Sequence, residues 1–391
     1  MKRYNKSKKS RKSSRIANRI VNFSPGDYVL AGVVLVLTIF GVVMVYNTGL
    51  VVAFEQFGDK YWFFKNQSLW AVLGIIGGFI VSNLNHEVWK RLGVWLFVIS
   101  VIMLLLVLIP GFSPQVYGAK QRLVIPGVPF LDRLSIQPSE LVKLSLIIYL
   151  SALFVKEKAE KKAFPYMQFL VVLGVVAGLT AVEPDLGNAI LITSSALVVF
   201  FAAGANVFVF MGILAVGLVS ALLYALSSEY RRQRILTFLN PLSGTSSVSY
   251  HITQIFIALG SGGFLGLGLG NSRQKYQYIP EVTTDSIFAI IGEELGFVGA
   301  VLVIAALVFI IWRGFKIASE CKDEFGRLLA LGVTANIGFQ AIVNLGGMVG
   351  IMPFTGVPLP FISYGGTSLT LLLISVGILL SISRSNNLNK R

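Results

Sequence analysis

The sequence predicts an all-α, polytopic membrane protein, and three observations support this fold class. Of the 391 residues, 55% are hydrophobic and only 13% are charged, whereas a soluble globular protein carries roughly 25% charged residues. The apolar residues gather in long runs, and a helix needs about 20 of them to cross the hydrocarbon core. Basic residues cluster outside these runs, beginning with nine in the first 19 positions.

Ten apolar segments are candidate transmembrane helices, and no soluble domain interrupts them. The segments are 28–46, 63–83, 91–110, 138–155, 166–182, 186–203, 206–226, 286–311, 327–350 and 366–383. The fifth and sixth are separated by Pro184 and Gly187, which break a helix. No small-residue cleavage site follows the first segment, so we expect a retained anchor rather than a signal peptide.

The distribution of basic residues predicts that both termini are cytoplasmic. With the N-terminus inside, 22 basic residues fall in inner segments and ten in outer loops, as the positive-inside rule requires. Residues 1–26 then form a basic cytoplasmic tail, 27–384 a single ten-helix membrane domain, and 385–391 a short cytoplasmic tail. One long extracytoplasmic loop, 227–285, joins helices 7 and 8. Its apolar, glycine-rich part is expected to lie on or dip into the membrane interface.

Composition also excludes several function classes. The net charge of +15 does not indicate nucleic-acid binding, because the basic residues lie in the tails and loops of a membrane chain. A single cysteine and two distant histidines give no pattern for a disulfide, zinc or haem. The glycine run 260–270 lacks the flanking strand and helix of a dinucleotide-binding fingerprint. We therefore expect no organic cofactor.

The long outer loop holds five basic residues against the usual charge bias. Guanidinium groups bind phosphate oxygens bidentately, so the cluster suits an anionic, phosphate-bearing substrate. Contact with lipid headgroups is the simpler alternative for any one of them. The five are Arg231, Arg232, Arg234, Arg273 and Lys275; we take all but Arg232 as candidate substrate-binding residues.

Four acids follow in the stretch "YIPEVTTDSIFAIIGEELGF". Glu281 and Asp285 would share a helical face, and a carboxylate beside a site for an anionic substrate is a candidate general base. A helix N-cap is the alternative for Asp285. Either carboxylate could also contact a divalent cation, Mg²⁺ or Mn²⁺. Glu293 and Glu294 lie deeper, where a charge must face the bundle interior or be protonated, so we expect at least one to be a buried structural partner.

Polar residues also occur within the apolar segments. Glu140 and Lys143 are spaced i, i+3, so Lys143 either pairs with Glu140 or reaches a substrate phosphate. Gln340 and Asn344, spaced i, i+4, could hydrogen-bond across the bundle. We add all four residues of these two pairs to the candidate substrate-binding residues.

Two further stretches carry turn signals. The stretch "GVPLPFISYGGTS", 356–368, predicts a shaped re-entrant loop, and its Ser363 joins the candidate substrate-binding residues. Glu183 and Asp185 sit in a tight outer turn. We favour an Asx-type cap for Asp185, with a cation site as the alternative.

Four motifs together resemble the SEDS family (shape, elongation, division, sporulation), and its FtsW and SpoVE branch more than its RodA branch. They are "QPSELVKL", "EPDLGNA", "GLGLGNSRQKYQYIPEVTTDSIFAIIGEELGFVGA" and "GVPLPFISYGGTS". The resemblance implies a peptidoglycan glycosyltransferase that polymerises lipid II on the outer face of the bacterial plasma membrane, at the division septum. It also implies a cognate class B penicillin-binding protein and other divisome membrane proteins as partners.

The same resemblance implies roles for individual residues. Asp285 matches the family's essential loop aspartate, and Glu281, Glu140 and Lys143 match other functionally important positions. Where the family usually reads His-Thr-Asp-Phe, this chain reads Thr-Thr-Asp-Ser at 283–286. A lipid II flippase, using the polar interior residues as a headgroup path, is the alternative function, and a scaffold that only recruits the penicillin-binding protein is a third. The charged outer loop favours the enzyme.

Overall fold

We analysed a computed structural model of the chain, which describes residues 26–109, 111–113, 121–123, 136–239, 247–276 and 278–388. Residues 1–25 of the predicted basic tail and the last three residues of the C-terminal tail lie outside the described residues. Helices are the main regular secondary structure of the described part, which otherwise contains turns, loops and one isolated bridge between Leu123 and Ile136. The predicted all-α class is therefore confirmed.

Each of the ten predicted segments is a helix. They are α2 (Tyr28–Phe57), α3 (Trp62–Asn83), α4 (Glu87–Leu108), α5 (Pro138–Ala159), α6 (Tyr166–Val182), α7 (Leu186–Ala202), α8 (Val207–Leu226), α11 (Ile287–Glu320), α12 (Glu324–Met348) and α13 (Gly366–Leu388). Eight are long and apolar enough to cross a membrane, whereas α6 and α7 have 17 residues each. The chain is thus a multi-pass membrane protein.

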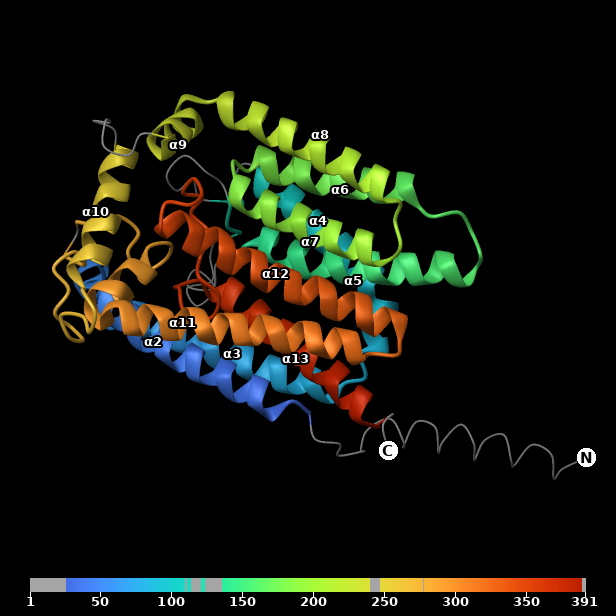
Figure 1. The fold of residues 1–391 in the computed structure, drawn as a ribbon, viewed down its shortest axis with the longest axis horizontal. Coiled ribbons are helices and arrows are strands. Elements are labelled where there is room, and N and C mark those ends of the chain that lie inside the picture. Colours follow the sequence, from blue (N-terminus) through green and yellow to red (C-terminus); the bar gives the residue numbers. More distant parts are fainter. Residues whose placement is uncertain are drawn as a thin grey trace, which may run out of the picture.

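The long loop after α8 contains two further helices, α9 (Glu229–Leu239) and α10 (Ser247–Ser261). Both lie at one end of the bundle, with the start of α11 and the segment between α12 and α13 (Figure 1). We call this the loop end. The beginning of α2 and the end of α13 lie together at the opposite end, which we call the terminal end.

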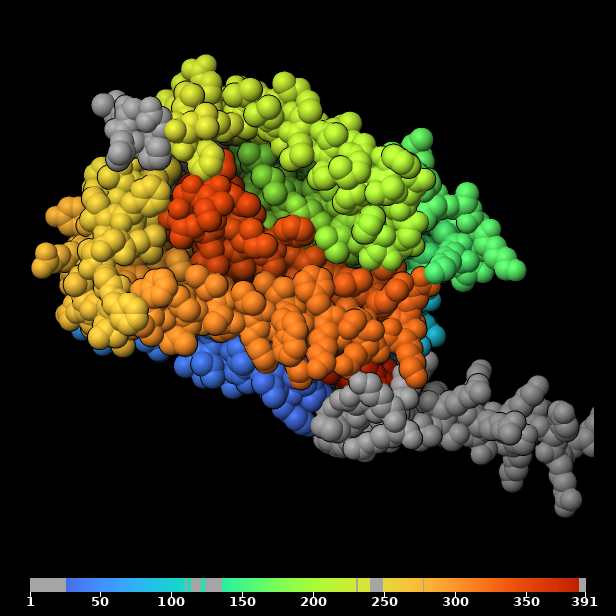
Figure 2. Space-filling model, in the orientation of Figure 1, coloured from blue at the N-terminus to red at the C-terminus, as the bar shows by residue number. Residues whose placement is uncertain are grey.

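The helices differ widely in burial. In α5 and α12, 78% of the most apolar window is buried, so these helices form the centre of the bundle. In α8 only Ala225 is buried. Figure 2 shows the surface hollowed between α8–α9 and the red segment that precedes α13, with green atoms from the middle of the chain at its floor.

Two helices extend about ten residues beyond their predicted ends, and the other boundaries differ by up to five residues. The first continues from 46 to Phe57, although the polar residues Asn47 and Thr48 interrupt its apolar run. The Thr48 hydroxyl donates to the Met44 carbonyl, and Asn47 has polar partners inside the bundle. The eighth predicted helix extends to Glu320 and is kinked at Gly296, where φ is 66° and ψ is −164°.

The glycine-rich stretch after α10 packs backbone to backbone against this kink. The amides of Leu267 and Gly268 donate to the carbonyls of Glu293 and Glu294 at 3.0 Å each, and the amide of Phe297 donates to Gly263 at 2.9 Å. A Cβ on Gly266 would lie 2.2 Å from the Glu294 carbonyl oxygen. Gly266 also has φ of 82°, which a side chain disfavours. Only glycine permits this contact.

Replacing Gly266 by alanine is expected to lower the free energy of unfolding by more than about 2 kcal/mol, because the substitution combines a positive φ with a backbone clash. Gly260→Ala is the matched control, since its Cβ would meet nothing within 4 Å. Thermal unfolding of the purified proteins in detergent measures both. Equal melting temperatures for the two variants would contradict the tight contact.

Candidate active site at the loop end

The segment between α12 and α13, residues 349–365, is not helical although much of it is buried. Its apolar side chains fill the space between helices, with Ile362 and Leu359 at 0% and 1% exposure. The segment also approaches α2 closely, since a Cβ on Gly41 would lie 2.6 Å from the Ile362 Cα. The predicted shaped loop is therefore present, and α13 begins at Gly366.

Polar side chains from the surrounding helices satisfy the backbone of this segment. Gln340 donates to the Pro358 carbonyl at 3.0 Å, and Asn344 donates to the Val357 carbonyl at 2.7 Å. Gln67 of α3 donates to the Ser363 carbonyl at 3.1 Å. The Ser363 hydroxyl accepts from the Leu359 amide at 2.8 Å. Gln340, Asn344 and Ser363, expected to bind substrate, are thus occupied in holding the loop.

Asp285 lies just before α11 and is tied to this loop. The Asn344 side chain, which donates to the Val357 carbonyl, also donates to the Asp285 carbonyl at 2.9 Å. A Cβ on Gly356 would lie 3.0 Å from the Asp285 carboxylate, so the carboxylate rests against the loop backbone. The neighbouring carbonyl of Thr283 accepts from the Tyr364 amide at 2.8 Å. The loop and the start of α11 therefore hold Asp285 in one place.

Two nearby charges act on the Asp285 carboxyl. Its pKa is raised well above the ordinary value, first by burial and then by the Glu281 carboxylate, while the Arg234 guanidinium opposes the rise. Glu281 is exposed and sits in a turn rather than a helix, with φ of 53°. The expected i, i+4 helical relation is therefore wrong. The two acids nevertheless interact, since the Glu281 carboxylate contributes to the raised pKa of Asp285.

The arginines expected beside this acid divide into two groups. Arg234 of α9 is partly buried, donates to the Phe354 carbonyl at 3.4 Å and lies 5.8 Å from the centre of the Phe354 ring. Arg231 instead folds back onto the end of α8, where its guanidinium lies 4.0 Å from the centre of the Tyr224 ring. Arg232 pairs with Glu229 at 2.7 Å. Arg234 is the arginine that the structure brings to Asp285.

A histidine that the sequence analysis did not select also joins the site. The ring Nε2 of His251, in α10, lies 2.9 Å from the hydroxyl of Ser286, the residue that follows Asp285. The same ring lies edge-on to the Phe354 ring. Burial, and secondarily the charge of Arg234, lower the pKa of His251 to about 4. The ring is therefore neutral at pH 7. The chain has only two histidines. The one clue to a role for His251 was its position between the basic residues of the outer loop.

Lys275 does not join this cluster. Its ammonium is buried and pairs with Glu294 at 3.0 Å, and it donates to Asn47 and to the Gly270 carbonyl. Arg273 is exposed, and its amide donates to Glu293 at 2.9 Å. The predicted structural role of the deeper acids is thus confirmed for both, because each accepts hydrogen bonds from the 272–275 turn. For Lys275 the geometry favours the same structural role over substrate binding.

A second polar cluster lies where α5 and α7 begin. Lys143 and Glu140 form a buried ion pair at 2.7 Å. Asp185 caps α7 through the Asn188 amide at 3.0 Å, as expected. Burial, the largest influence, raises the pKa of Asp185, and Lys143 lowers it. Asp185 in turn raises the pKa of Asp285, so this carboxylate connects the two clusters electrostatically.

Glu183, the other acid of that turn, is buried with both carboxylate oxygens unpaired within the described residues. Burial, reinforced by Asp185, raises its pKa to about 8, so it is mostly protonated at pH 7. A protonated acid is a poor ligand for a cation. Among the residues that the structure covers, no three His, Cys, Asp or Glu side chains gather as a metal site.

Comparisons with known proteins identify the family to which the chain belongs. The family described as cell cycle protein, comprising FtsW, RodA and SpoVE, matches residues 27–388. The probable peptidoglycan glycosyltransferase FtsW of Geobacter sp. (strain M18) is 37% identical over 359 residues, which cover 91% of this chain and 96% of that protein. Stage V sporulation protein E of Bacillus subtilis (strain 168) is 39% identical over 363 residues, with 92% and 97% covered.

Solved structures are similar as well. A chain of a peptidoglycan synthase complex, solved to show the coordination of polymerization and crosslinking, matches with a TM-score of 0.73 and 27% identity, over 92% of this chain and 98% of that chain. The rod shape determining protein RodA of Thermus thermophilus matches with a TM-score of 0.68 and 26% identity, over 94% and 99%.

Replacing Lys275 by methionine is expected to lower the free energy of unfolding by about 3–5 kcal/mol, because it leaves the buried Glu294 carboxylate without its cation. The control is Arg273→Gln, two residues away and exposed, which should change stability by less than about 0.5 kcal/mol. Chemical or thermal unfolding in detergent measures both. A Lys275→Met protein as stable as the Arg273→Gln protein would show that Lys275 is not a structural residue.

Proposed function

Since the chain belongs to the FtsW, RodA and SpoVE family of cell cycle proteins, we propose that it is a peptidoglycan glycosyltransferase that polymerises lipid II on the outer face of the bacterial plasma membrane. The observation that carries this proposal is the Asp285 carboxyl, fixed between two backbone segments, with a raised pKa and with Arg234 beside it. This arrangement suits a base that works next to an anionic substrate.

In this mechanism Asp285 takes the proton from the 4-hydroxyl of the acceptor N-acetylglucosamine. That oxygen attacks C1 of the donor N-acetylmuramic acid, and undecaprenyl pyrophosphate leaves with its bonding electrons. A single displacement inverts the anomeric centre. The raised pKa of Asp285 makes its carboxylate a stronger base than an ordinary aspartate.

The pyrophosphate leaving group requires positive charge near it. Arg234 is the first candidate, because it reaches Asp285 from α9. The exposed Arg273 can contact a phosphate only if the substrate extends over the 271–276 turn. Lys143 remains a candidate substrate contact through its ion pair with Glu140, which keeps the ammonium in place. Arg231 would then act by holding α9 against α8.

The same polar residues argue against the flippase. The side-chain amide groups of Gln340 and Asn344, inside the bundle, both donate to the loop backbone. A headgroup path would need such groups to be available along the bundle. These groups instead stabilise a fixed framework, which favours an enzyme whose substrates bind at the loop end.

For the whole chain we propose ten membrane spans in one domain, 27–384, with both termini in the cytoplasm. The shorter helices α6 and α7 would each extend about 26 Å, close to the thickness of the hydrocarbon core. The start of α2 and the end of α13 lie at the same end of the bundle, which agrees with this topology. The loop end then faces outward.

We also propose partners and a location. The similar chain of the peptidoglycan synthase complex supports a class B penicillin-binding protein as the crosslinking partner. Similarity to proteins named FtsW supports the division septum and other divisome membrane proteins. Asp285 and Glu281 offer two carboxylates rather than a three-ligand cluster, so we assign no step to Mg²⁺ or Mn²⁺, and a cation requirement stays a prediction.

Replacing Asp285 by alanine or asparagine is expected to reduce lipid II polymerisation by at least about 100-fold, because the general base is removed. The control is Asp59→Asn, which removes a carboxylate from a surface pair with Lys65. Gel analysis of glycan strands made by the purified protein, with and without its partner, measures the rate. Polymerisation by Asp285→Ala at a rate near wild type would contradict the assignment.

The pH dependence should follow the charges beside Asp285. Activity requires the deprotonated carboxyl and is therefore lost as pH falls through its pKa. Glu281→Gln removes a charge that raises this pKa, so the acidic limb should move to lower pH. Arg234→Gln should move it to higher pH, whereas Arg234→Lys keeps the charge and should move it less. Initial rates measured across pH test this, and shifts in the opposite directions would count against Asp285 as the titrating group.

A further inference from the structure

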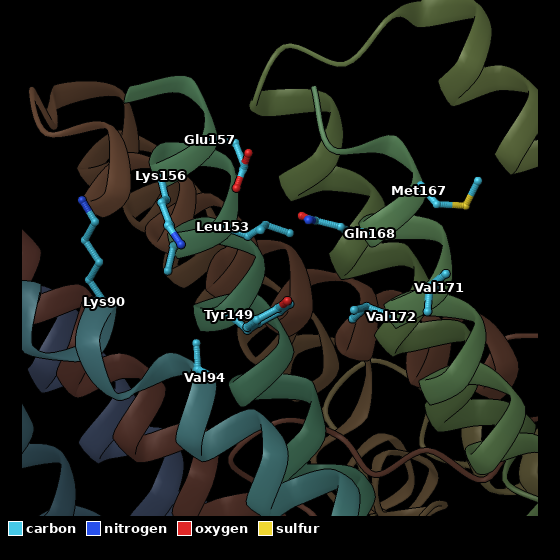
Figure 3. A pocket seen from close by; sticks show the side chains of 11 residues that line it. Lys90, Val94, Tyr149, Leu153, Lys156, Glu157, Met167, Gln168, Val171 and Val172 are labelled. Atoms are coloured by element: carbon cyan, nitrogen blue, oxygen red, sulfur yellow. The ribbon is translucent and has the colours of Figure 1, made fainter. Parts of the chain in front are cut away.

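A cavity of about 590 Å³ lies near the terminal end, between α4, α5 and α6. Helix α4 packs closely on α5, whereas α6 packs mainly on α7 and makes little contact with either α4 or α5, which leaves a space between the three helices. Figure 3 shows the α5 residues Tyr149, Leu153 and Lys156 facing Gln168 and Val172 of α6 across this space. The cavity is distant from Asp285, because α5 begins at the loop end and ends here.

The cavity opens sideways, toward the membrane. Val94 of α4 and Met167 and Val171 of α6 line it and are 50%, 73% and 56% exposed. Exposed apolar side chains on a membrane helix face lipid chains. The lower part of the cavity is therefore an apolar groove that is continuous with the surrounding hydrocarbon.

The upper part is basic. Lys90 lies in the first turn of α4 and Lys156 in the last turn of α5, so both stand at the same height at the terminal end. Both are exposed, and within the described residues neither forms an ion pair with a carboxylate. Glu157 also lines the cavity, but Lys162 lies 3.8 Å from its carboxylate and offsets its charge.

The distance between the two parts matches a lipid. Tyr149 is seven residues before Lys156, which places it about 10 Å deeper along the helix, and its hydroxyl points into the cavity (Figure 3). A glycerophospholipid has the same layout, with a phosphate at the interface and acyl chains below it. Basic pockets between transmembrane helices on the cytoplasmic side are a recurrent form of anionic lipid recognition.

We propose that this groove binds an anionic phospholipid of the cytoplasmic leaflet, with its phosphate between Lys90 and Lys156 and an acyl chain along Val94, Leu153 and Val172. The ligand class follows from charge complementarity, since a zwitterionic headgroup would bring a third cation to a site that already has two, Lys90 and Lys156. A second hollow shares Lys90 with the first and is also lined by Glu87, Arg91, Asp323 and Phe325; its acidic and basic side chains are equal in number, so the net positive charge is confined to the first cavity.

The test compares two lipids that differ only in headgroup. Dioleoyl phosphatidylglycerol or dioleoyl phosphatidylcholine is added to the full-length protein in detergent, and retained lipid is measured by native mass spectrometry. The wild-type protein should prefer phosphatidylglycerol by about tenfold or more, and Lys90→Gln with Lys156→Gln should abolish that preference. Each lysine near the headgroup is expected to change affinity by about fivefold.

Two controls separate this site from general charge and from folding. Lys161→Gln with Lys322→Gln removes the same charge from exposed positions at the same end and should keep the preference. Ala152→Phe fills the floor of the groove and should reduce retention of both lipids, while an unchanged melting temperature shows that the variant is folded. Equal retention of the two lipids by the wild type, or equal loss in both lysine pairs, would overturn the proposal.

Discussion

The structure depends on one constraint, which is that a non-helical backbone buried inside a membrane bundle must find hydrogen-bond partners. Each unpaired peptide group there would cost several kcal/mol. Residues 349–365 meet this requirement through Gln67 of α3 and through Gln340 and Asn344 of α12. Because Asn344 also binds the Asp285 carbonyl, the bonds that make the irregular segment tolerable also fix the position of the proposed base.

A second framework supports the other side of the site by a different principle. Glycines at 262, 266 and 296 allow the outer loop to pack directly on the kinked backbone of α11. Glu293 and Glu294 then accept hydrogen bonds from the next turn of that loop, and Lys275 forms an ion pair with Glu294. Asp285 thus stands between two rigid segments, whereas Arg234 reaches it from a helix that follows the weakly packed α8.

Much of the fold was predictable, because membrane helices depend on local hydropathy. All ten apolar segments became helices, and Glu281 and Asp285 were selected correctly as neighbours, although by a helical relation that is wrong. The unpredicted features are those that depend on contacts distant in sequence. His251 reaches Ser286 only because α10 folds back along α11, and Lys275 is removed from the basic cluster by Glu294, an acid 19 residues away.

The uneven packing of the bundle has an evolutionary consequence. In α8 only Ala225 is buried, so most of its positions are constrained only to remain apolar and helical. Random substitutions among Leu, Val, Ile and Phe should accumulate there almost freely. In α12, where 78% of the core window is buried, the same substitutions change the packing volume and are removed by selection. Sequence drift should therefore be fast along α8, which precedes the arginines of α9, and slow along α12, which supports Asp285.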